Sequence, residues 1–300
     1  MGAVFYDENA SGTQDPSENT RVPGVVVEVG GKSSAPSSKV LGEVTIAGVP
    51  GGSQALTVRR GSLPPYYVPP AGLSISVPPS QPVMIPLTLP IGTNRPNVYM
   101  AFGDSITGAG TDALGYRGRL QDKLVGYFGR GTVIGEGVDS TKSNEGADRI
   151  DLSLQRVHPA YTVILYGTND WNAKECKNAP PCYTIDSLRD IVLSVRGAQS
   201  LPVLSTIIPG DPTSTDQPAR NAWVAAQNVR IRALARDLAV PLADPEALFL
   251  KDPDFAHLYV DHVHPSDAGY ELIAAAFFTA ITAPADSSAT SALGRLLARP

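Results

Sequence analysis

The chain has 300 residues, 42% of them hydrophobic, and this length and composition fit one large globular domain or two modest ones. The formal net charge of −5 and the pI near 5.4 argue against a nucleic-acid-binding protein, and the sequence has no basic cluster to contradict this. No apolar run approaches the length that crosses a bilayer, and the first residues do not resemble a signal peptide. A cytoplasmic protein and the mature form of an exported one both fit these features.

Residues 1–20 are polar and contain Gly and Pro, so we expect a frayed end or a loosely docked segment there. Between Val22 and Gly92, short β-prone runs alternate with Gly, Pro and Ser clusters, which predicts a small antiparallel sheet or sandwich. We therefore expect residues 1–95 to form a β-rich accessory module. It either binds a polymer and shapes the rim of a site, or extends the next domain structurally. The lack of an aromatic series beyond Tyr66-Tyr67 favours the structural extension.

From Val98 onward, strand and helix patterns alternate, which is typical of a parallel sheet wrapped by helices. The first strand, Val98–Phe102, is followed at once by Gly103-Asp104-Ser105. A serine just past a strand end has its hydroxyl at the edge of the sheet, where backbone N–H groups can face a developing negative charge. Ser105 is therefore a candidate nucleophile. On these residues alone, a helix cap formed by Asp104 and Ser105 is the commoner explanation.

The remaining pattern predicts four further strands and five helices in an α/β domain over residues 96–283, followed by a tail at 284–300. The tail is expected to be a docked short helix or disordered. The predicted strands are 132–134, 161–166, 201–208 and 240–243, and the predicted helices are 116–128, 150–157, 185–195, 224–238 and 265–281.

Two of these strands end in residues suited to binding an oxyanion. Gly167-Thr168-Asn169-Asp170 follows the strand at 161–166, and the Asn169 amide can donate a hydrogen bond, although an Asn-Asp turn is the alternative. The strand at 132–134 runs into glycines, and the N–H of Gly137 is a candidate second donor. Trp171 would sit near the cleft and pack against an acyl or sugar group. A buried Trp171 that supports the loop is equally consistent with the sequence.

Cys176 and Cys182 are the two cysteines of the chain, and they flank residues 177–181 just downstream of Asn169. A disulfide closing this short loop would stiffen the rim of the proposed site and would indicate an oxidising compartment. Free thiols are the alternative, and metal binding would need more ligands. We expect the disulfide.

Asp261-His262-Val263-His264-Pro265 precedes the last predicted helix. A serine nucleophile needs a base, and the base needs a partner that orients it. The Asp-x-x-His spacing lets one loop supply both, with Asp261 orienting His264. His262 is the competing base, but it adjoins Asp261 and would point elsewhere. A metal site made of Asp261, His262 and His264 is less favoured because no segment rich in Cys or carboxylates would complete it.

Gly-Asp-Ser-Ile, a glycine after the second strand, Gly-Thr-Asn-Asp and Asp-x-x-His-Pro follow one another in this order. Over about residues 97–283 the chain thus resembles the SGNH hydrolases, also called the GDSL esterase/lipase superfamily. The resemblance implies a flavodoxin-like three-layer α/β fold with a five-stranded parallel sheet. It also implies a triad of Ser105, Asp261 and His264, and an oxyanion hole of Ser105, Gly137 and Asn169. Many members have Asn-x-Gly-x-x-Gly in the second block, where this chain has Gly135-Glu136-Gly137-Val138-Asp139-Ser140, so Gly137 is the best match in a block that departs from the family pattern.

The expected activity is hydrolysis of a small-molecule or glycan ester through an acyl-enzyme, without a metal or organic cofactor and without a nucleic-acid partner. Because no long hydrophobic lid segment is evident, short acyl chains are favoured. The alternatives are a lipase or phospholipase, a carbohydrate O-acetyl esterase, an acyltransferase or thioesterase with the same residues, and a glycan-binding surface protein with a vestigial hydrolase domain. Removal of the Asn169 donor is expected to cost about 3 kcal/mol of transition-state stabilisation. The expected disulfide favours a secreted or periplasmic location.

Overall fold

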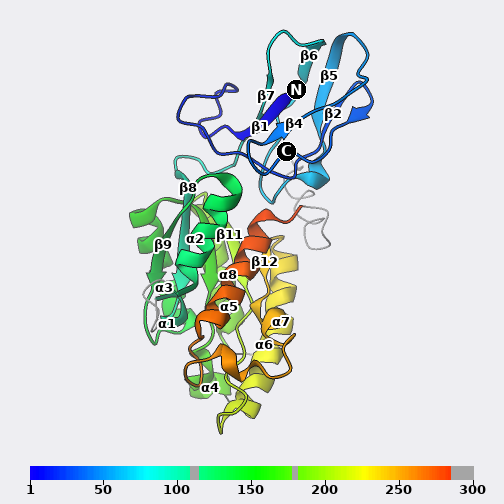
Figure 1. Ribbon diagram of the computed structural model, residues 1–300. Helices are drawn as coiled ribbons and strands as arrows, with labels where there is room; N and C mark the ends of the chain where they lie inside the picture. Colours follow the sequence, from blue (N-terminus) through cyan, green and yellow to red (C-terminus); the bar gives the residue numbers. More distant parts are fainter. Residues whose placement is uncertain (109–114, 178–181, 285–300) are drawn as a thin grey trace. The chain divides into compact units, whose positions relative to one another are not determined.

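The computed structural model describes residues 1–108, 115–177 and 182–284 (Figure 1). These residues fall into two compact units. The β-rich unit contains Met1–Pro90 together with Lys123–Gly131, and the α/β unit is drawn from Ile91–Asp122 and Thr132–Ile281. That residues 1–95 and 96–283 each fold independently stays a prediction. From residue 285 onward the predicted tail lies outside the described residues.

The α/β unit is built on a five-stranded sheet with the strand order β12-β11-β10-β8-β9. Every pair of neighbouring strands in it is parallel, which confirms the predicted fold class. Its strands are β8 (Arg95–Gly103), β9 (Thr132–Gly137), β10 (Pro159–Leu165), β11 (Leu201–Ser205) and β12 (Leu242–Ala243).

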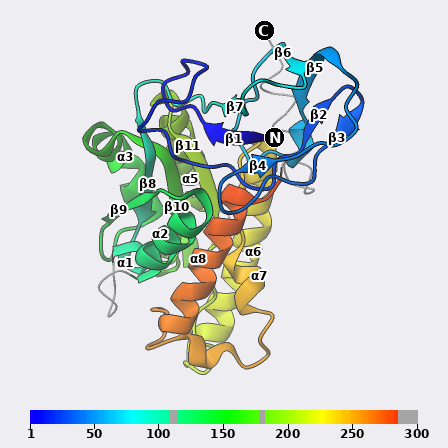
Figure 2. The same cartoon turned by 45° about the horizontal axis from the view of Figure 1, so that its top comes forward.

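Helices cover both faces of this sheet, with α2 and α8 on one face and α3, α5 and α6 on the other (Figures 1 and 2). On the first face the rings of Tyr116 from α2 and Phe277 from α8 stack with their centroids 5.4 Å apart. The helices are α1 (Ser105–Gly108), α2 (Gly115–Phe128), α3 (Ser143–Val157), α4 (Lys174–Lys177), α5 (Thr184–Gly197), α6 (Gln217–Asp237), α7 (Pro245–Phe249) and α8 (Asp267–Thr282), with 3₁₀ turns at Asp170–Asn172 and Phe255–Leu258.

The central strands are buried on both faces, which is why they read as continuous apolar runs in the sequence. All seven residues of β10 are buried. Val98, Met100 and Phe102 of β8 alternate along the strand, and their side chains belong to the core that α3, α5 and α6 cover. Leu152 of α3 is 69% exposed because residues two positions apart on a helix point to opposite sides, and Ile150 and Leu154 face the core.

The order of the strands sets the place of the site. From β8 the chain passes to its neighbour β9 and then returns to β10 on the other side of β8. In open α/β sheets the ligand crevice forms where the order reverses in this way, outside the carboxyl ends of the strands. The residues that follow β8, beginning with Asp104 and Ser105, therefore lie where this fold binds its ligands.

The β-rich unit contains two small sheets, with the orders β4-β1-β7 and β3-β2-β5-β6. Every strand pair in the second sheet is antiparallel, as the sequence predicted. The strands are β1 (Gly2–Tyr6), β2 (Val27–Val29), β3 (Lys32–Ser33), β4 (Glu43–Val44), β5 (Gly52–Val58), β6 (Leu73–Val77) and β7 (Val83–Leu87), with a 3₁₀ turn at Arg60–Ser62.

The expectation of a frayed N-terminal end is wrong. Gly2–Tyr6 form β1, the central strand of the first sheet, which pairs antiparallel with β4 and in parallel with β7. This sheet is therefore mixed rather than purely antiparallel. Val4, Phe5 and Tyr6 are almost completely buried, and both neighbouring strands supply hydrogen-bond partners to the backbone of β1. Those partners lie far along the chain, so the local sequence did not reveal them.

The predicted disulfide between Cys176 and Cys182 is present, with the Cα atoms 4.7 Å apart. Cys176 is fully buried, and its carbonyl accepts a hydrogen bond from the indole N–H of Trp223 at 3.0 Å. The bond closes the segment that follows the end of β10. Among the described residues, no helix is both long and apolar enough to cross a membrane.

Replacing both Cys176 and Cys182 with serine is expected to lower the free energy of unfolding by about 2 kcal/mol, because the short cross-link restricts the unfolded chain. Urea denaturation with and without a thiol reductant measures the effect. Reductant should move the wild-type midpoint towards that of the variant and leave the variant unchanged. A wild-type midpoint insensitive to complete reduction would contradict a stabilising role for the bond.

Candidate active site

Ser105 is the first residue of α1 and directly follows the carboxyl end of β8. The turn is closed by Asp104, whose Oδ1 accepts a hydrogen bond from the Ile106 N–H at 3.0 Å and whose carbonyl accepts one from Gly108. Gly103 has no room for a side chain, since a Cβ there would collide with Thr107 and with the backbone of β10. Asp104 thus caps the turn, and Ser105 is left free to present its hydroxyl.

The hydroxyl of Ser105 meets the imidazole of His264, with Oγ 3.0 Å from Nε2. On the other side of the ring, Nδ1 lies 2.8 Å from Oδ2 of Asp261. The other carboxylate oxygen, Oδ1, accepts the backbone N–H groups of Val263 at 2.8 Å and His264 at 2.7 Å. Because a carboxylate only accepts, the proton belongs on Nδ1, and Nε2 is left to accept the proton of Ser105.

The Asp261 carboxylate stays ionised at neutral pH. Burial alone would raise the pKa of Asp261, but the hydrogen bonds from the N–H groups of His264 and Val263 and from the His264 ring outweigh it and lower the pKa to about 2. A permanent negative charge beside Nδ1 orients the ring and favours its protonated form once Nε2 takes up a proton.

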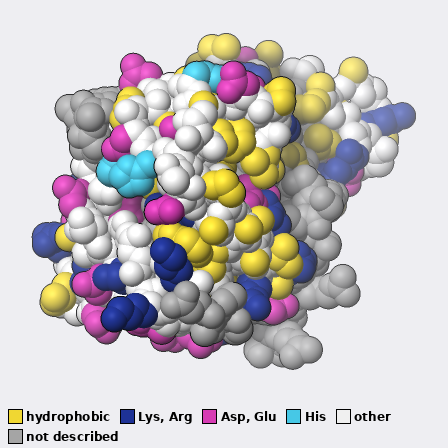
Figure 3. Space-filling model, turned by 90° about the horizontal axis from the view of Figure 1, so that it is seen from below, with side chains coloured by type: hydrophobic (Ala, Val, Ile, Leu, Met, Phe, Trp, Pro, Cys, Tyr) yellow, Lys and Arg dark blue, Asp and Glu magenta, His cyan; other side chains and the backbone are white. Residues whose placement is uncertain are grey.

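His262, the competing base, lies apart from this arrangement. Its side chain is 61% exposed, and its Nδ1 is 3.9 Å from Asp261, beyond hydrogen-bonding distance. Figure 3 shows histidine side chains reaching the surface on the face seen from below, among acidic and apolar side chains. The described residues contain no group of His, Cys, Asp and Glu side chains that could hold a metal ion.

Asn169 follows the end of β10, and its side-chain Nδ2 donates to the carbonyl of Thr141 at 3.0 Å. A carbonyl only accepts, so the NH₂ end of the amide faces Thr141 and its second hydrogen remains for another acceptor. This is the arrangement that an oxyanion donor needs. The role of Asn169 in binding an oxyanion stays a prediction.

Gly137 is the last residue of β9, the edge strand of the sheet. A Cβ at Gly137 would collide with the backbone of Thr107 and Gly108, so the close approach of β9 to α1 requires glycine here. The N–H of Val138, one residue later, donates to the Gly103 carbonyl at 3.0 Å. Backbone groups alternate in direction along a strand, so the N–H of Gly137 points away from β8. Its predicted role as a donor rests on the family pattern alone.

Trp171 is 8% exposed and packs edge-to-face on Trp223, with the ring centroids 6.0 Å apart. The ammonium of Lys177 lies 5.1 Å from the centroid of its ring. These contacts fit the alternative in which Trp171 supports the loop after Asn169. A contact with substrate stays a prediction.

The sequence profile of the GDSL-like lipase/acylhydrolase family matches residues 101–272, which is more than half of the chain. The chain belongs to this family. No curated protein is similar to it in sequence. The matched region includes all the residues that the sequence predicted for the triad and the oxyanion hole, and membership of this family supports a hydrolase.

Solved structures of esterases and lipases share the fold of this chain. An acetylxylan esterase from Geobacillus stearothermophilus is 23% identical, with a TM-score of 0.52 over 63% of this chain and 95% of the esterase. A putative lipolytic protein of the G-D-S-L family from Desulfitobacterium hafniense DCB-2 is 18% identical, with a TM-score of 0.50 over 61% of this chain and 99% of that one. A GDSL-like lipase from Bacteroides thetaiotaomicron VPI-5482 is 19% identical, with a TM-score of 0.50 over 62% and 87% of the two chains.

Asp104, next to Ser105 in this hydrolase, is a fully buried carboxyl group. Its Oδ2 has no hydrogen-bond partner among the described residues. Burial raises the pKa of Asp104 to about 7, with a further increase from Asp170, while the Ile106 N–H and the charges of His264 and Arg220 lower it. Near neutral pH the group therefore changes its charge inside the protein.

Replacing Asp104 with asparagine is expected to change how stability depends on pH. In the wild type the folded-state pKa of about 7 exceeds the ordinary value of 3.8, so the folded protein holds the proton more tightly than the unfolded chain. The protonated Asp104 carboxyl therefore adds to the free energy of unfolding, and the full amount is present below the ordinary pKa of 3.8. It is lost as the pH rises through about 7, at up to about 1.4 kcal/mol per pH unit. Asparagine does not titrate, so the variant does not lose stability in this way. As the pH rises from 3.8 to about 7, the variant should therefore become more stable relative to the wild type.

Urea denaturation at several pH values between the two pKa values measures this slope. Asp151→Asn is the matched control, because Asp151 lies exposed on α3 and its replacement should leave the slope unchanged. Parallel pH curves for the wild type and Asp104→Asn would contradict the raised pKa.

Asp170 and Arg220 tie together the segments next to Asn169. Asp170 is fully buried and accepts hydrogen bonds from the N–H and Oγ of Ser143 at 2.8 and 2.6 Å and from Oγ1 of Thr184 at 2.7 Å. It joins the starts of α3 and α5 to the end of β10. Asp170 therefore ties these three segments together through its carboxylate.

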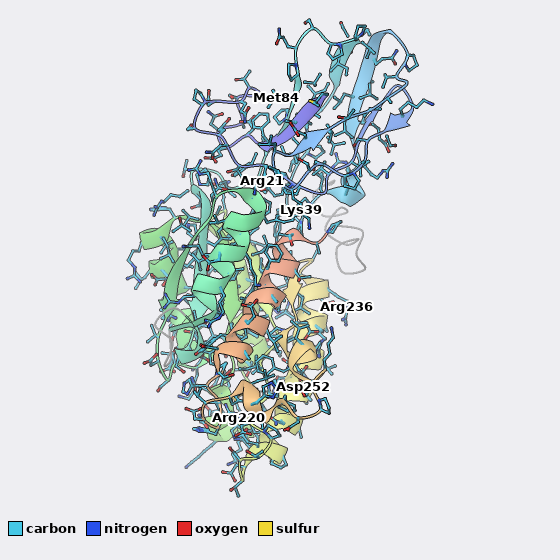
Figure 4. The ribbon with its side chains drawn as sticks, viewed as in Figure 1. Arg21, Lys39, Met84, Arg220, Arg236 and Asp252 are labelled. Atoms are coloured by element: carbon cyan, nitrogen blue, oxygen red, sulfur yellow. A yellow bond between two sulfur atoms is a disulfide. The ribbon has the colours of Figure 1, made fainter. Side chains whose placement is uncertain are left out.

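Sequence reasoning missed Arg220, which is 5% exposed and labelled in Figure 4. Its Nη2 donates to the carbonyl of Thr168, the residue before Asn169, at 2.7 Å. Burial lowers the pKa of Arg220, and the negative charge of Asp104 opposes this. No sequence signal marks Arg220, because one arginine in an amphipathic helix normally lies in solvent.

Proposed function

We propose that the protein is a serine esterase that hydrolyses short-chain carboxylic esters through Ser105, His264 and Asp261. The observation that carries the proposal is the continuous pair of contacts from Ser105 Oγ to His264 Nε2, at 3.0 Å, and from His264 Nδ1 to Asp261, at 2.8 Å. Serine becomes nucleophilic when a base accepts its proton, and these distances allow that transfer without any rearrangement.

In the proposed reaction the Ser105 hydroxyl attacks the ester carbonyl carbon and its proton passes to Nε2 of His264. The Ser105 N–H, the Gly137 N–H and the Asn169 amide stabilise the negatively charged oxygen of the tetrahedral intermediate. Protonated His264 then gives the proton to the leaving alcohol, which leaves the acyl group on Ser105. Water activated by His264 hydrolyses the acyl-enzyme, and Asp261 keeps the ring in the required orientation throughout.

The preference for short acyl chains rests on the absence of a long hydrophobic lid segment in the sequence. An acetyl group is the smallest common acyl group, and acetylated glycans are therefore natural candidates. The acetylxylan esterase that shares this fold adds acetylated xylooligosaccharides to the substrates to be tested. We also propose a secreted or periplasmic location, supported by the Cys176–Cys182 disulfide, which persists in oxidising compartments.

Hydrolysis of p-nitrophenyl esters from acetate to palmitate tests the proposal. The expected result is a maximum in kcat/KM at the short chains, with acetylated xylan run alongside to detect a glycan esterase. A maximum at palmitate would replace the short-chain proposal with a lipase. Absence of hydrolysis of every ester by folded protein would favour the glycan-binding alternative. Product analysis with an added alcohol acceptor distinguishes an acyltransferase.

A further inference from the structure

Arg149 on α3 binds the ends of three neighbouring strands. Its Nη2 donates to the carbonyls of Gly103, at the end of β8, and Glu136, near the end of β9, at 2.9 and 2.7 Å. The same nitrogen is 2.6 Å from Oη of Tyr166, which directly follows β10, and Nε is 3.1 Å from that oxygen. The guanidinium carbon lies 4.1 Å from the centroid of the Phe102 ring. An arginine offers a rigid fork of donors, so its position defines those of its acceptors.

Because Arg149 can only donate, the donor and acceptor of each following hydrogen bond are fixed. An arginine only donates, so Tyr166 Oη accepts from it and directs its own hydrogen to Thr141 Oγ1, 3.0 Å away. Thr141 Oγ1 in turn donates to the carbonyl of Val138 at 2.7 Å. Burial raises the pKa of Tyr166, so the phenol keeps the hydrogen that this chain of bonds requires.

The last step reaches the proposed oxyanion donor. The carbonyl of Thr141 accepts one hydrogen of the Asn169 side-chain amide at 3.0 Å. The amide is planar, so fixing one N–H also fixes the direction of the other. Thr141 thus receives a hydrogen bond on its side chain from Tyr166 and orients Asn169 through its backbone.

A glycine in α3 leaves room for the ring of Tyr166. Tyr166 is 1% exposed, and a Cβ at Gly146 would lie 2.7 Å from its ring carbon Cε2. Glycine inside a helix costs roughly 0.5–1 kcal/mol relative to alanine, so its presence here matches a need for close approach. The ring cannot move towards the helix, and Arg149 holds its hydroxyl at the other end.

We propose that Arg149, Tyr166 and Thr141 form a positioning relay for the reaction, which directs the free N–H of Asn169 towards the oxyanion. The inference rests on the proposed function and deepens it, because it assigns to three residues the task of preorganising one donor. None of the three touches the substrate. Their effect on the rate passes through Asn169, since an oxyanion donor acts only when it is held in place before the reaction.

Tyr166→Phe tests the relay, because it removes one oxygen and keeps the buried ring. We expect kcat to fall by about 10–100-fold with little change in KM, as for a misplaced catalytic group. Asn169→Ala alone should lower kcat by about 10²–10³-fold. In the Asn169→Ala background, Tyr166→Phe should have no further effect. A Tyr166→Phe variant as active as the wild type, or the same loss in both backgrounds, would overturn the relay.

Tyr183→Phe is the matched control. The Tyr183 hydroxyl is buried and has no hydrogen-bond partner among the described residues, so removing it should leave kcat unchanged. Arg149→Lys keeps the charge but not the fork, and it should reproduce the loss of kcat seen with Tyr166→Phe. If this variant does not fold, the comparison of Tyr166→Phe in the wild-type and Asn169→Ala backgrounds still tests the relay.

A readout without catalysis separates the relay from the proposed function. The side-chain amide resonances of Asn169, assigned by their loss in Asn169→Ala, should shift and broaden in Tyr166→Phe and stay unchanged in Tyr183→Phe. If the wild type hydrolyses no ester but these resonances respond, the proposed function fails while the relay stands as a structural device. If the resonances do not respond in an active enzyme, the relay is wrong and the esterase proposal survives.

Discussion

Replacing Ser105 with alanine is expected to lower kcat for p-nitrophenyl acetate by about four to six orders of magnitude. The variant loses the atom that attacks the ester, while His264 and the backbone of the turn remain. Because Ser105 follows a turn that Asp104 closes, the substitution should leave the fold intact, which thermal unfolding can verify. KM is expected to change much less than kcat, since the hydroxyl matters most in the transition state.

Two further measurements sharpen this result. Ser74→Ala, an exposed position on β6, is the control and should retain full activity. A fluorophosphonate probe should modify wild-type protein at Ser105, as mass spectrometry of its peptides can show, and should fail to modify Ser105→Ala. Retention of wild-type turnover by Ser105→Ala, or probe attachment at another residue, would rule out the proposed nucleophile.

The variants His264→Ala and His262→Ala are expected to differ strongly in kcat. His264→Ala should lose about four orders of magnitude or more in kcat, because Ser105 then has no base. His262→Ala should stay near wild type, since its ring is 61% exposed and makes no hydrogen bond with Asp261. The two histidines are two positions apart, so each serves as the control for the other.

Combining the variants tests whether the residues act as a unit. The double variant Ser105→Ala, His264→Ala should be no less active than either single variant, because triad members contribute jointly rather than independently. Losses that multiply would show that His264 works separately from Ser105. A larger loss for His262→Ala than for His264→Ala would reverse the assignment of the base.

Much of the α/β unit could be predicted because its signals are local. The strand before Ser105 and the strand before Asn169 are short apolar runs that end at a glycine, and the structure places β8 and β10 there. The Asp-x-x-His spacing also describes a local turn, in which the Asp261 carboxylate accepts the backbone N–H of His264 at 2.7 Å. Such features depend on residues close in sequence, so the pattern contains the information.

The failures of the sequence prediction share a different cause. β1 was expected to be frayed or loosely docked, yet it is the central strand of a sheet because β7, far along the chain, pairs with it. Arg220 precedes the predicted helix at 224–238, yet it belongs to α6 and is buried against Thr168. The relay from Arg149 through Tyr166 to Thr141 was likewise not foreseen. Each of these depends on contacts between segments that are distant in the sequence. A local pattern does not predict which distant segment will lie next to it.

The α/β class, the chemical groups and the strand ends that carry them follow from the amino-acid sequence, because apolar runs and the glycines that end them are local properties of the chain. Which of these groups meet depends on contacts between distant segments of the folded chain. Ser105 and His264 are 159 positions apart, and their 3.0 Å contact follows from the reversal of strand order at β8 and the packing of the helices on the sheet. The orientation of the Asn169 amide depends on the folded chain in the same way, since its hydrogen bond to the Thr141 carbonyl requires a distance and a direction that only the folded chain defines.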